Sequence, residues 1–192
     1  MTGTVFQMNL ACPGMDRSGE HTLTLFLVKE CENAATLRSS ILQGGTDLPA
    51  EVALIDASMI LDPVIVHAAA GMALQQHMST TQTLKSKTLH SELVFSLAGS
   101  KHIGRSLAMF GIKDDSKNLL VAMFDASAEA VDALLASIEG HIVTEESEIR
   151  QELDSICDRA EVCKAYKISD VELEVGSITD AVLCRIAARD CV

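Results

Sequence analysis

Aromatic side chains are scarce in this 192-residue chain: they make up 3% of it, with no Trp and a single Tyr. A hydrophobic core must therefore be built from Leu, Ile, Val, Ala and Met, and the hydrophobic fraction of 48% is large enough for one. A platform of aromatic rings for stacking single-stranded bases is not expected. The length suits a single domain, residues 1–192, that buries roughly 70% of the surface of the unfolded chain.

Long hydrophobic runs are also missing. The longest segment without a charged residue, Pro63 to Leu84, contains His67, His77 and three glutamines and is too polar to span a membrane. The first residues, MTGTVFQMNL, lack the basic and apolar regions of a signal peptide. We therefore expect no membrane association and a location in the cytoplasm and nucleus.

Closely spaced cysteines are absent. None of the six forms a CxxC pair, and their separations exceed those that metal sites favour. We expect reduced thiols that behave as small buried hydrophobic residues. The six are Cys12, Cys31, Cys157, Cys163, Cys184 and Cys191.

No catalytic or nucleotide-binding motif is present. The sequence has no P-loop, GxGxxG, HExxH or GxSxG pattern. His67 and His77 are ten residues apart on one predicted helix, which is not the spacing of a metal-binding pair. Asp56 and Asp62 flank a turn, and nothing supports their acting as paired acid and base. We therefore predict no metal, no cofactor and no enzymatic activity.

Charge is distributed unevenly. The chain has a formal net charge of −12, which argues against general binding of polyanions. Between Pro63 and Lys113, however, the only acid is Glu92. The bases of that segment are Lys85, Lys87, Lys101, Arg105 and Lys113. This pattern indicates a basic face on an acidic body, for which a solvated face without a ligand is the plainer alternative.

The hydrophobic pattern predicts an α/β domain, with a small, mostly antiparallel central sheet of about five strands flanked by six to seven helices. The expected strands are 5–10, 22–28, 52–55, 89–97 and 118–124. The expected helices follow Asn33, Asp62-Pro63, Gly99-Ser100 and Ser127, and cover 145–154, 158–163 and 177–189. The last begins with a capping-box pattern, Ser177 followed by Asp180.

One segment has a physical basis for anion binding. Gly99-Ser100 precedes a helix expected from Lys101 to Phe110, so backbone N–H groups there can hold a phosphate. Lys101 and Arg105 are four residues apart and share a face, and His102 adds a donor. A turn with solvated bases is an equally good interpretation of these residues alone.

Three blocks of sequence resemble a known family. Thr88 to Ile112 reads TLHSELVFSLAGSKHIGRSLAMFGI, the block from Glu161 reads EVCKAYKIS, and that from Gly176 reads GSITDAVLCRIAARDCV. In this order and spacing they resemble the PRPK-binding protein family, a small subunit of the EKC/KEOPS complex. The resemblance extends from about residue 20 to the C-terminus.

The resemblance implies a function. Members of the family are α/β domains without catalytic activity that bind the N-lobe of a small atypical kinase, which is an ATPase. Through this kinase they join the threonylcarbamoyl-transferase subunit, which modifies tRNA next to the anticodon. Archaeal relatives engage the 3′ end of tRNA, and we expect tRNA binding by this chain alone to be weak because its net charge is negative.

Residue roles follow from the resemblance. Family members bind the kinase partly through the C-terminal helix, which implies that the helix at about 177–189 is the partner-binding element. The candidates on it are Ile178, Ala181, Val182, Arg185 and Ile186. The candidates for contact with tRNA are Lys85, Lys87, Gly99, Ser100, Lys101, His102 and Arg105. Compared with the archaeal SG-x-RQI segment, Lys101 stands in place of Arg, which keeps the charge but loses the planar guanidinium fork. His102 stands in place of Gln.

Two alternatives stay open at this point. The apolar stripe of the last helix, with Val182 and Ile186, could face the protein's own core. The chain could also be a small-molecule enzyme or ligand-binding domain on the same scaffold, using some of His67, His90, His102 and the carboxylates. That hypothesis requires these histidines to converge in one pocket.

Overall fold

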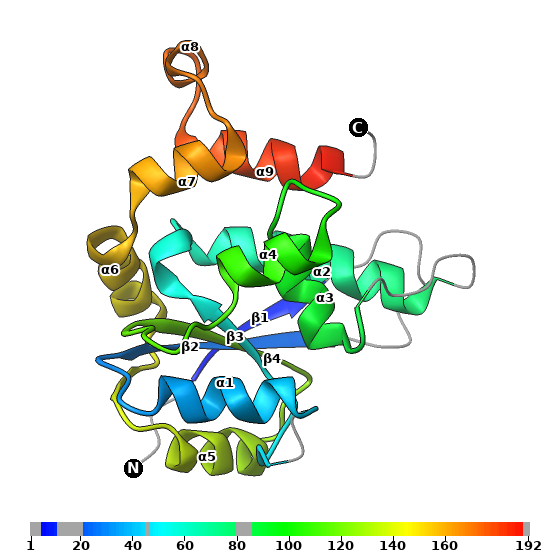
Figure 1. Cartoon of the computed structure of the whole chain (residues 1–192), viewed down its shortest axis with the longest axis vertical. Helices are drawn as coiled ribbons and strands as arrows, with labels where there is room; N and C mark the ends of the chain where they lie inside the picture. The colour runs from blue at the N-terminus through cyan, green and yellow to red at the C-terminus, as the bar shows by residue number, and fades with distance from the viewer. Residues whose placement is uncertain (1–4, 11–20, 45–46, 80–85, 190–192) are drawn as a thin grey trace.

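An antiparallel sheet forms the centre of the molecule (Figure 1). The computed structural model of the chain describes residues 5–10, 21–44, 47–79 and 86–189. The strand order is β1-β2-β4-β3, and β5 pairs with β2 beyond the end of β1. The strands are β1 (Phe6–Leu10), β2 (His21–Lys29), β3 (Ala53–Asp56), β4 (Leu119–Phe124) and β5 (His141–Val143).

Helices cover both faces of the sheet, as Figure 1 shows. Helices α1 (Ala34–Leu42) and α5 (Ala128–Ser137) pack on one face, where Phe26 and Val28 of β2 point. On the other face, where Leu25 and Leu27 point, lie α2 (Pro63–Met78), α3 (Leu89–Ser96) and α4 (Ile103–Phe110). The alternation along β2 therefore supplies two separate cores, because successive side chains of a strand point to opposite faces.

A C-terminal helical extension, Arg159–Ala188, stands on the second layer. A 3-10 turn, η1 (Ala57–Met59), follows β3. Much later in the chain, the acidic helix α6 (Glu146–Ile156) is followed by α7 (Arg159–Tyr166), α8 (Asp170–Leu173) and α9 (Ile178–Ala188). Helix α9 packs on α2, and the Asp158 backbone N–H donates to the carbonyl of Ser58 at 2.8 Å. Helix α2 therefore packs between the sheet and α9, and eight of its 16 residues are buried.

The predicted fold class and the antiparallel sheet are confirmed. Nine α-helices lie in the part of the chain that the structure describes, compared with the six or seven expected. The Asp62 carboxylate caps α2 by accepting from the Val64 N–H at 2.8 Å, and Ser177 caps α9 by accepting from the Asp180 N–H at 3.1 Å. These local signals located the helix starts correctly.

The predicted strand 89–97 is wrong, because this segment is α3. The Thr88 side chain caps it by accepting from the Ser91 N–H at 3.1 Å. Leu89, Leu93 and Leu97 are spaced four apart, which fits a helix as well as it fits alternation. Because α3 is buried on nearly all sides, polarity along it did not distinguish the two periods. The fifth strand is instead the three-residue β5, which was missed together with α8.

Candidate functional site

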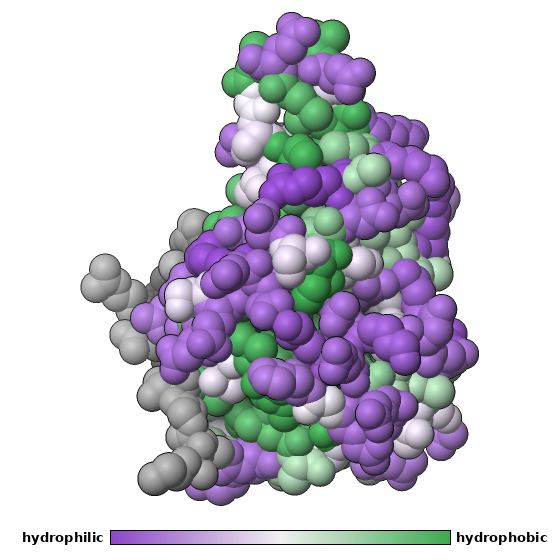
Figure 2. All heavy atoms as spheres, turned by 90° about the vertical axis from the view of Figure 1, so that its left-hand side faces the viewer, coloured by the Kyte–Doolittle hydropathy of each residue, from purple (hydrophilic) through white to green (hydrophobic). Residues whose placement is uncertain are grey.

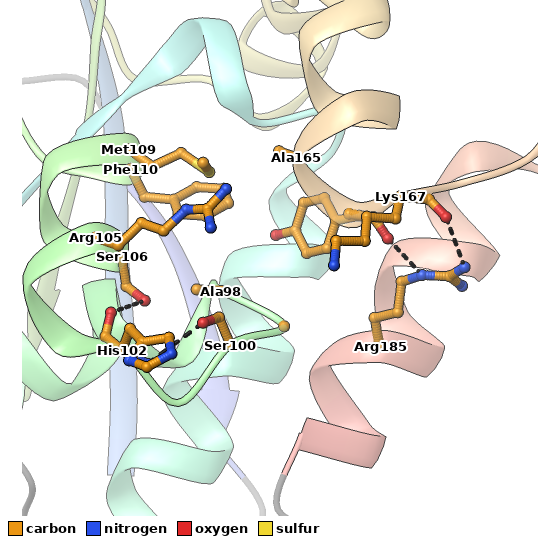
Figure 3. Close-up of a pocket in the computed structure, with 12 residues that line it drawn as sticks. Ala98, Ser100, His102, Arg105, Ser106, Met109, Phe110, Ala165, Lys167 and Arg185 are labelled. Carbon is orange, nitrogen blue, oxygen red and sulfur yellow. Dashed lines mark hydrogen bonds between the residues drawn. The ribbon is translucent and has the colours of Figure 1, made fainter. Parts of the chain in front are cut away.

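A polar pocket of about 370 Å³ lies where α4 meets the C-terminal helical extension (Figure 3). The turn 98–102 and α4 form one wall, and the end of α7 with Arg185 of α9 forms the other. The Ser106 hydroxyl donates to the carbonyl of His102 at 2.9 Å, which fixes the first turn of α4. The pocket therefore joins two parts of the chain that are about 80 residues apart in sequence.

The structure brings together four of the seven residues predicted to contact tRNA. Gly99, Ser100, His102 and Arg105 all line the pocket. Lys101 lies on the same turn and is exposed, but it does not line the pocket.

Of the two lysines predicted before α3, the structure describes one. Lys87 is exposed and precedes the helix that was expected to be a strand, so it does not line the pocket either. Lys85 lies outside the described residues. Of the basic residues predicted between Lys85 and Arg105, the structure thus places Arg105 at the pocket and Lys87 and Lys101 outside it.

Lys167 is a pocket residue that sequence reasoning missed. It ends α7 in the left-handed conformation, with φ 53° and ψ 47°. Its backbone N–H donates to the carbonyls of Cys163 and Lys164, so the helix end is closed. Its position could not be deduced from spacing, although it lies in the EVCKAYKIS block.

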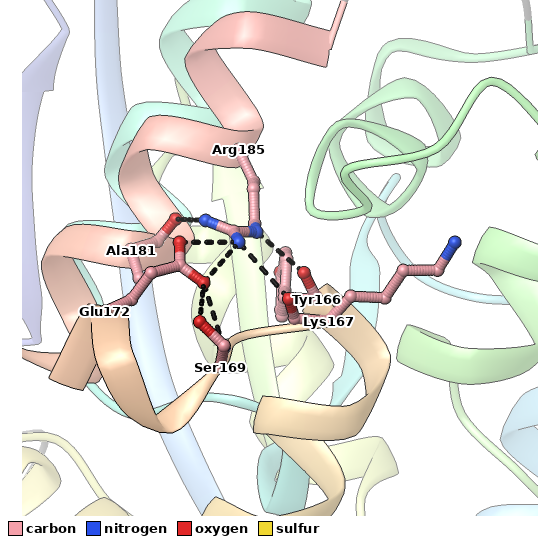
Figure 4. Close-up of polar contacts among 6 residues, drawn as sticks. All are labelled: Tyr166, Lys167, Ser169, Glu172, Ala181 and Arg185. Carbon is pink, nitrogen blue, oxygen red and sulfur yellow. Dashed lines mark hydrogen bonds and ion pairs between the residues drawn. The ribbon is translucent and has the colours of Figure 1, made fainter.

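Arg185 holds the far wall in place (Figure 4). Its Nε donates to the carbonyl of Tyr166 at 2.7 Å, and its Nη2 donates to Glu172 Oε1 at 2.7 Å. The Glu172 carboxylate also accepts from the Ser169 backbone N–H at 2.9 Å. That backbone bond and the nearby guanidinium lower the pKa of Glu172. Arg185 thereby joins the end of α7, α8 and α9 into one unit, called the Arg185 clasp below.

The walls of the pocket are packed closely. The Tyr166 hydroxyl donates to the carbonyl of Leu97, and burial raises the pKa of that phenol. Phe110 and Tyr166 are 5.6 Å apart between ring centroids. A Cβ on Gly99 would lie 3.3 Å from Cβ of Arg185, so the turn approaches α9 closely and requires a small residue.

Positive charge dominates the pocket. Three of its lining residues are Arg105, Lys167 and Arg185, and none of the described lining residues is acidic. Glu172 balances Arg185. By contrast, no ion pair of Arg105 or Lys167 is found among the described residues. The pocket can therefore attract a phosphate or another anion, in contrast to the net charge of the whole chain.

The candidate partner residues on α9 divide between the core and the surface. Val182 and Ile186 are each 1% exposed and belong to the core of the monomer, so the apolar stripe faces inward. Ile178 and Ala181 are half-buried, and Arg185 is engaged in the clasp. Whether these five residues bind a partner stays a prediction.

A hydrophobic surface not predicted from the sequence lies on the neighbouring α8. Val171, Leu173 and Val175 are exposed by 71%, 38% and 89%, and they sit on the part of the molecule that projects furthest from the sheet. Figure 2 shows hydrophobic residues at this projecting end. We call these three residues the α8 tip.

The three histidines of the enzyme hypothesis do not share a pocket. His67 Nε2 lies 2.9 Å from the carbonyl oxygen of Asn9, and His90 Nε2 accepts from the Phe124 backbone N–H at 3.3 Å. His102 alone lines the polar pocket. In the described ranges no group of three potential metal ligands is found, and no helix there is long and apolar enough to cross a membrane.

The cysteines differ from expectation. Cys31 is buried, Cys157 and Cys163 are half-buried, and Cys184 is exposed, all as free thiols. Burial raises the pKa of Cys31 and raises that of Cys157 to about 11. The expectation of small buried residues therefore holds for Cys31 and is wrong for Cys184. Cys12 and Cys191 lie outside the described residues.

An α/β domain with a projecting helical extension and a basic pocket can serve as a binding subunit. Comparison with known families agrees: the family described as "Kinase binding protein CGI-121" matches residues 28–190. The chain belongs to this family.

Curated relatives span most of the chain. "EKC/KEOPS complex subunit TPRKB" of Danio rerio is 28% identical over 173 residues, covering 89% of this chain and 93% of the relative. "EKC/KEOPS complex subunit CGI121" of Coccidioides immitis is 34% identical, covering 84% and 77%. "EKC/KEOPS complex subunit cgi121" of Aspergillus terreus is 38% identical, covering 74% and 72%.

Proposed function

We propose that this chain is a non-catalytic subunit of an EKC/KEOPS complex in the cytoplasm and nucleus. It serves the threonylcarbamoyladenosine modification of tRNA next to the anticodon, through the threonylcarbamoyl-transferase subunit of that complex. It binds the N-lobe of the small atypical kinase and holds the 3′ end of the tRNA. The family match over residues 28–190 carries the kinase-binding part of this proposal.

The kinase docks on the α8 tip and the adjoining outer face of α9. Exposed apolar residues are typical of protein interfaces when they gather in one place, as Val171, Leu173 and Val175 do. The Arg185 clasp holds α8 in position before the partner arrives, which lowers the entropic cost of binding. Asp170 and Glu174 on this segment are exposed carboxylates, so the partner surface should be apolar with a basic rim.

Co-elution with the cognate kinase on gel filtration tests the docking surface. Removing the chain from Ser177 onward would expose α2, so point substitutions are the sharper test. We expect Val171→Glu together with Val175→Glu to abolish the heterodimer. Leu42→Glu, at a site that is 69% exposed on α1, is the matched control and should leave it intact. A heterodimer that tolerates the double substitution would place the kinase elsewhere.

The polar pocket receives the 3′ end of tRNA. The turn before α4 and the two cations that have no ion pair among the described residues, Arg105 and Lys167, suit the phosphates of a strand end. With so few cations, binding by the chain alone is weak and becomes effective within the complex, where joined subunits raise the effective concentration.

Fluorescence anisotropy with tRNA, with and without its last three nucleotides, tests this role. We expect log K to fall with log salt with a slope of only a few units, and each of Arg105→Glu and Lys167→Glu to reduce the slope by about one. Lys164→Glu is the control: this lysine is 78% exposed on α7 and pairs with Glu161 outside the pocket. Equal binding of intact and shortened tRNA would contradict the assignment.

A further inference from the structure

A second hollow, larger than the polar pocket, lies at the β3 edge of the sheet. It has a volume of about 680 Å³ and runs between α1 on one face of the sheet and α3 and α4 on the other. We call it the edge groove. Its size falls within the range of about 300 to 1,000 Å³ that is typical of small-molecule sites. It shares no lining residue with the polar pocket, so the function proposed above does not account for it.

The walls of the edge groove are apolar and come from four elements. Ile41 and Leu42 extend from α1, Leu54 from β3, Val94 from α3, and Leu107 and Ala108 from α4. Leu42 is 69% exposed at its mouth. A leucine so exposed beside other apolar walls leaves hydrophobic surface in water that a ligand would cover.

The groove is fixed by the backbone around it. The Ile112 N–H donates to the carbonyl of Leu54 at 3.1 Å. The segment after α4, residues 111–115, which we call the strap, is therefore hydrogen-bonded to the free edge of β3. A Cβ on Gly111 would lie 2.6 Å from the carbonyl oxygen of Leu107, so only glycine allows the strap to turn there. Lys113 Nζ donates to Asp56 Oδ2 at 2.7 Å and anchors the next part of the strap. The groove is thus formed before any ligand arrives.

A single buried polar group, His90, lines the groove. Because its Nε2 accepts from the Phe124 backbone N–H, the proton of the neutral ring lies on Nδ1. The His90 side chain is 8% exposed, and Nδ1 has no hydrogen-bond acceptor. The nearest carboxylate oxygen, Glu51 Oε2, is 3.4 Å away on a side chain that is 73% exposed. An acceptor on a ligand would reach the buried Nδ1 by displacing this exposed carboxylate.

The charges at the rim point to a neutral ligand. Arg38 pairs with Asp114 at 3.0 Å and Lys113 with Asp56, so neither cation is left for an anion. Asp115, also at the rim, is an exposed carboxylate. Burial lowers the pKa of His90, which keeps its ring neutral. A carboxylate or phosphate on the ligand would be repelled, whereas a carbonyl oxygen or ring nitrogen would not.

We infer that the edge groove is a binding site for a small apolar molecule that carries one neutral hydrogen-bond acceptor, received by Nδ1–H of His90. The site is independent of kinase and tRNA binding. Its apolar walls supply the affinity, and the single donor selects the orientation of the ligand.

Two bicyclic probes test this inference by ¹H–¹⁵N NMR on the full chain. Quinoline has an apolar body and a neutral ring nitrogen that accepts, whereas indole has a similar body and an N–H that donates. We expect saturable shifts of the Leu54, Val94 and Ile112 amides with quinoline, with a Kd on the order of 1 mM as for other small fragments. Indole should bind about fivefold more weakly, because it cannot accept from His90.

Gly104→Leu is the variant that fills the groove. A Cβ at Gly104, a lining residue, meets nothing within 4 Å, so a side chain can start there without a clash at Cβ. We expect it to weaken quinoline at least about fivefold by occupying the same apolar walls. Gly71→Leu on α2 is the matched control, since its Cβ also meets nothing within 4 Å and it lies outside the groove. Both should unfold at or above the wild-type temperature, because each removes a helical glycine.

The outcomes are distinct. Groove shifts with quinoline that are lost in Gly104→Leu and kept in Gly71→Leu support the site. No saturable shift up to 5 mM, equal affinity for indole, or equal loss in both variants would overturn it. Groove amides that shift on dilution without any probe would mean that a second copy fills the groove, which also overturns it.

Discussion

The sheet body and the C-terminal helical extension are stabilised in different ways. In β4 the five residues from Leu119 to Met123 are each at most 1% exposed, and both faces of the sheet are covered by helices. In the extension α8 has no buried residue, and α9 buries only Val182 and Ile186. The extension also buries Val162 and Tyr166 of α7, and its caps and the Arg185 clasp supplement this smaller core.

The difference bears on where apolar side chains stay exposed. A segment that is held largely by polar contacts, such as α8 and the residues after it, can keep Val171 and Val175 in solvent. Polar contacts contribute less to stability than apolar burial, so the extension should also open more readily than the sheet. The following predictions test that comparison, from the largest expected effect to the smallest.

The largest effect should come from the sheet. Leu27→Ala removes a side chain of β2 that is 0% exposed, and should lower the free energy of unfolding by about 3 kcal/mol because a cavity remains. Leu42→Ala, at 69% exposure, should change it by less than about 0.5 kcal/mol. Urea unfolding followed by circular dichroism measures both. Similar losses of stability in the two variants would mean that burial of apolar side chains is not the main source of stability in the sheet body.

Breaking the Arg185 clasp should lower the free energy of unfolding by less than Leu27→Ala does, and the effect should be confined to the extension. Arg185→Ala leaves the carbonyls of Tyr166 and Lys167 without their charged donor, and should lower stability by about 2 kcal/mol. Arg185→Lys should recover only part of this, because an ammonium cannot bridge those carbonyls and Glu172 as a planar fork does. Hydrogen exchange should show faster opening of α7 and α9 while β2 and β4 stay protected. Uniform acceleration would show that the extension and sheet unfold together.

Matched caps separate the two regions further. Ser177→Ala in the extension and Ser127→Ala in the body each remove a hydroxyl that accepts from the third helical N–H, at 3.1 and 3.2 Å. Each should cost about 1 kcal/mol. We expect Ser177→Ala to accelerate exchange mainly in α9, and Ser127→Ala to shift the global urea midpoint. A global shift with Ser177→Ala and a local effect with Ser127→Ala would contradict the expectation that the extension opens separately from the sheet.

The smallest effect concerns pH. Burial lowers the pKa of His90 despite the nearby Glu51 carboxylate, so the folded state favours the neutral ring. The stability that this group contributes is present above the unfolded pKa of about 6.5 and is lost as the pH falls below it. Between pH 7.5 and 5.5, His90→Gln should lose less stability than the wild type, as urea midpoints at the two values can show. Identical losses would contradict a neutral buried His90.

Much of the fold was predictable because its signals are local. The Asp62-Pro63 start of α2 and the capping pattern at Ser177 depend only on residues within one turn, and both were located correctly. The segment Leu89–Ser96 was not, because a helix enclosed on all sides shows no polar face from which its period can be recognised. The short β5 was missed because its pairing partner, β2, lies more than 100 residues earlier in the chain.

One wall of the polar pocket could be predicted from the sequence, and the other could not. The turn at Gly99 and the cations of α4 are adjacent in sequence, so their clustering followed from helix spacing. Lys167 and Arg185 reach the pocket only because α7 and α9 pack beside α4. The edge groove gave no sequence signal, since its walls come from separate elements that each appear as ordinary core residues.

By itself the sequence determined the class of fold, the antiparallel sheet, the main helix starts and the family, because these depend on local hydrogen bonding and on blocks of residues in order. Tertiary structure decided that Val182 and Ile186 face the core, that the α8 tip stays in solvent, and that Arg105 and Lys167 meet in one pocket. Each of these depends on which distant elements pack together. The residues next to an apolar or charged side chain in the sequence do not indicate which distant surface it will contact.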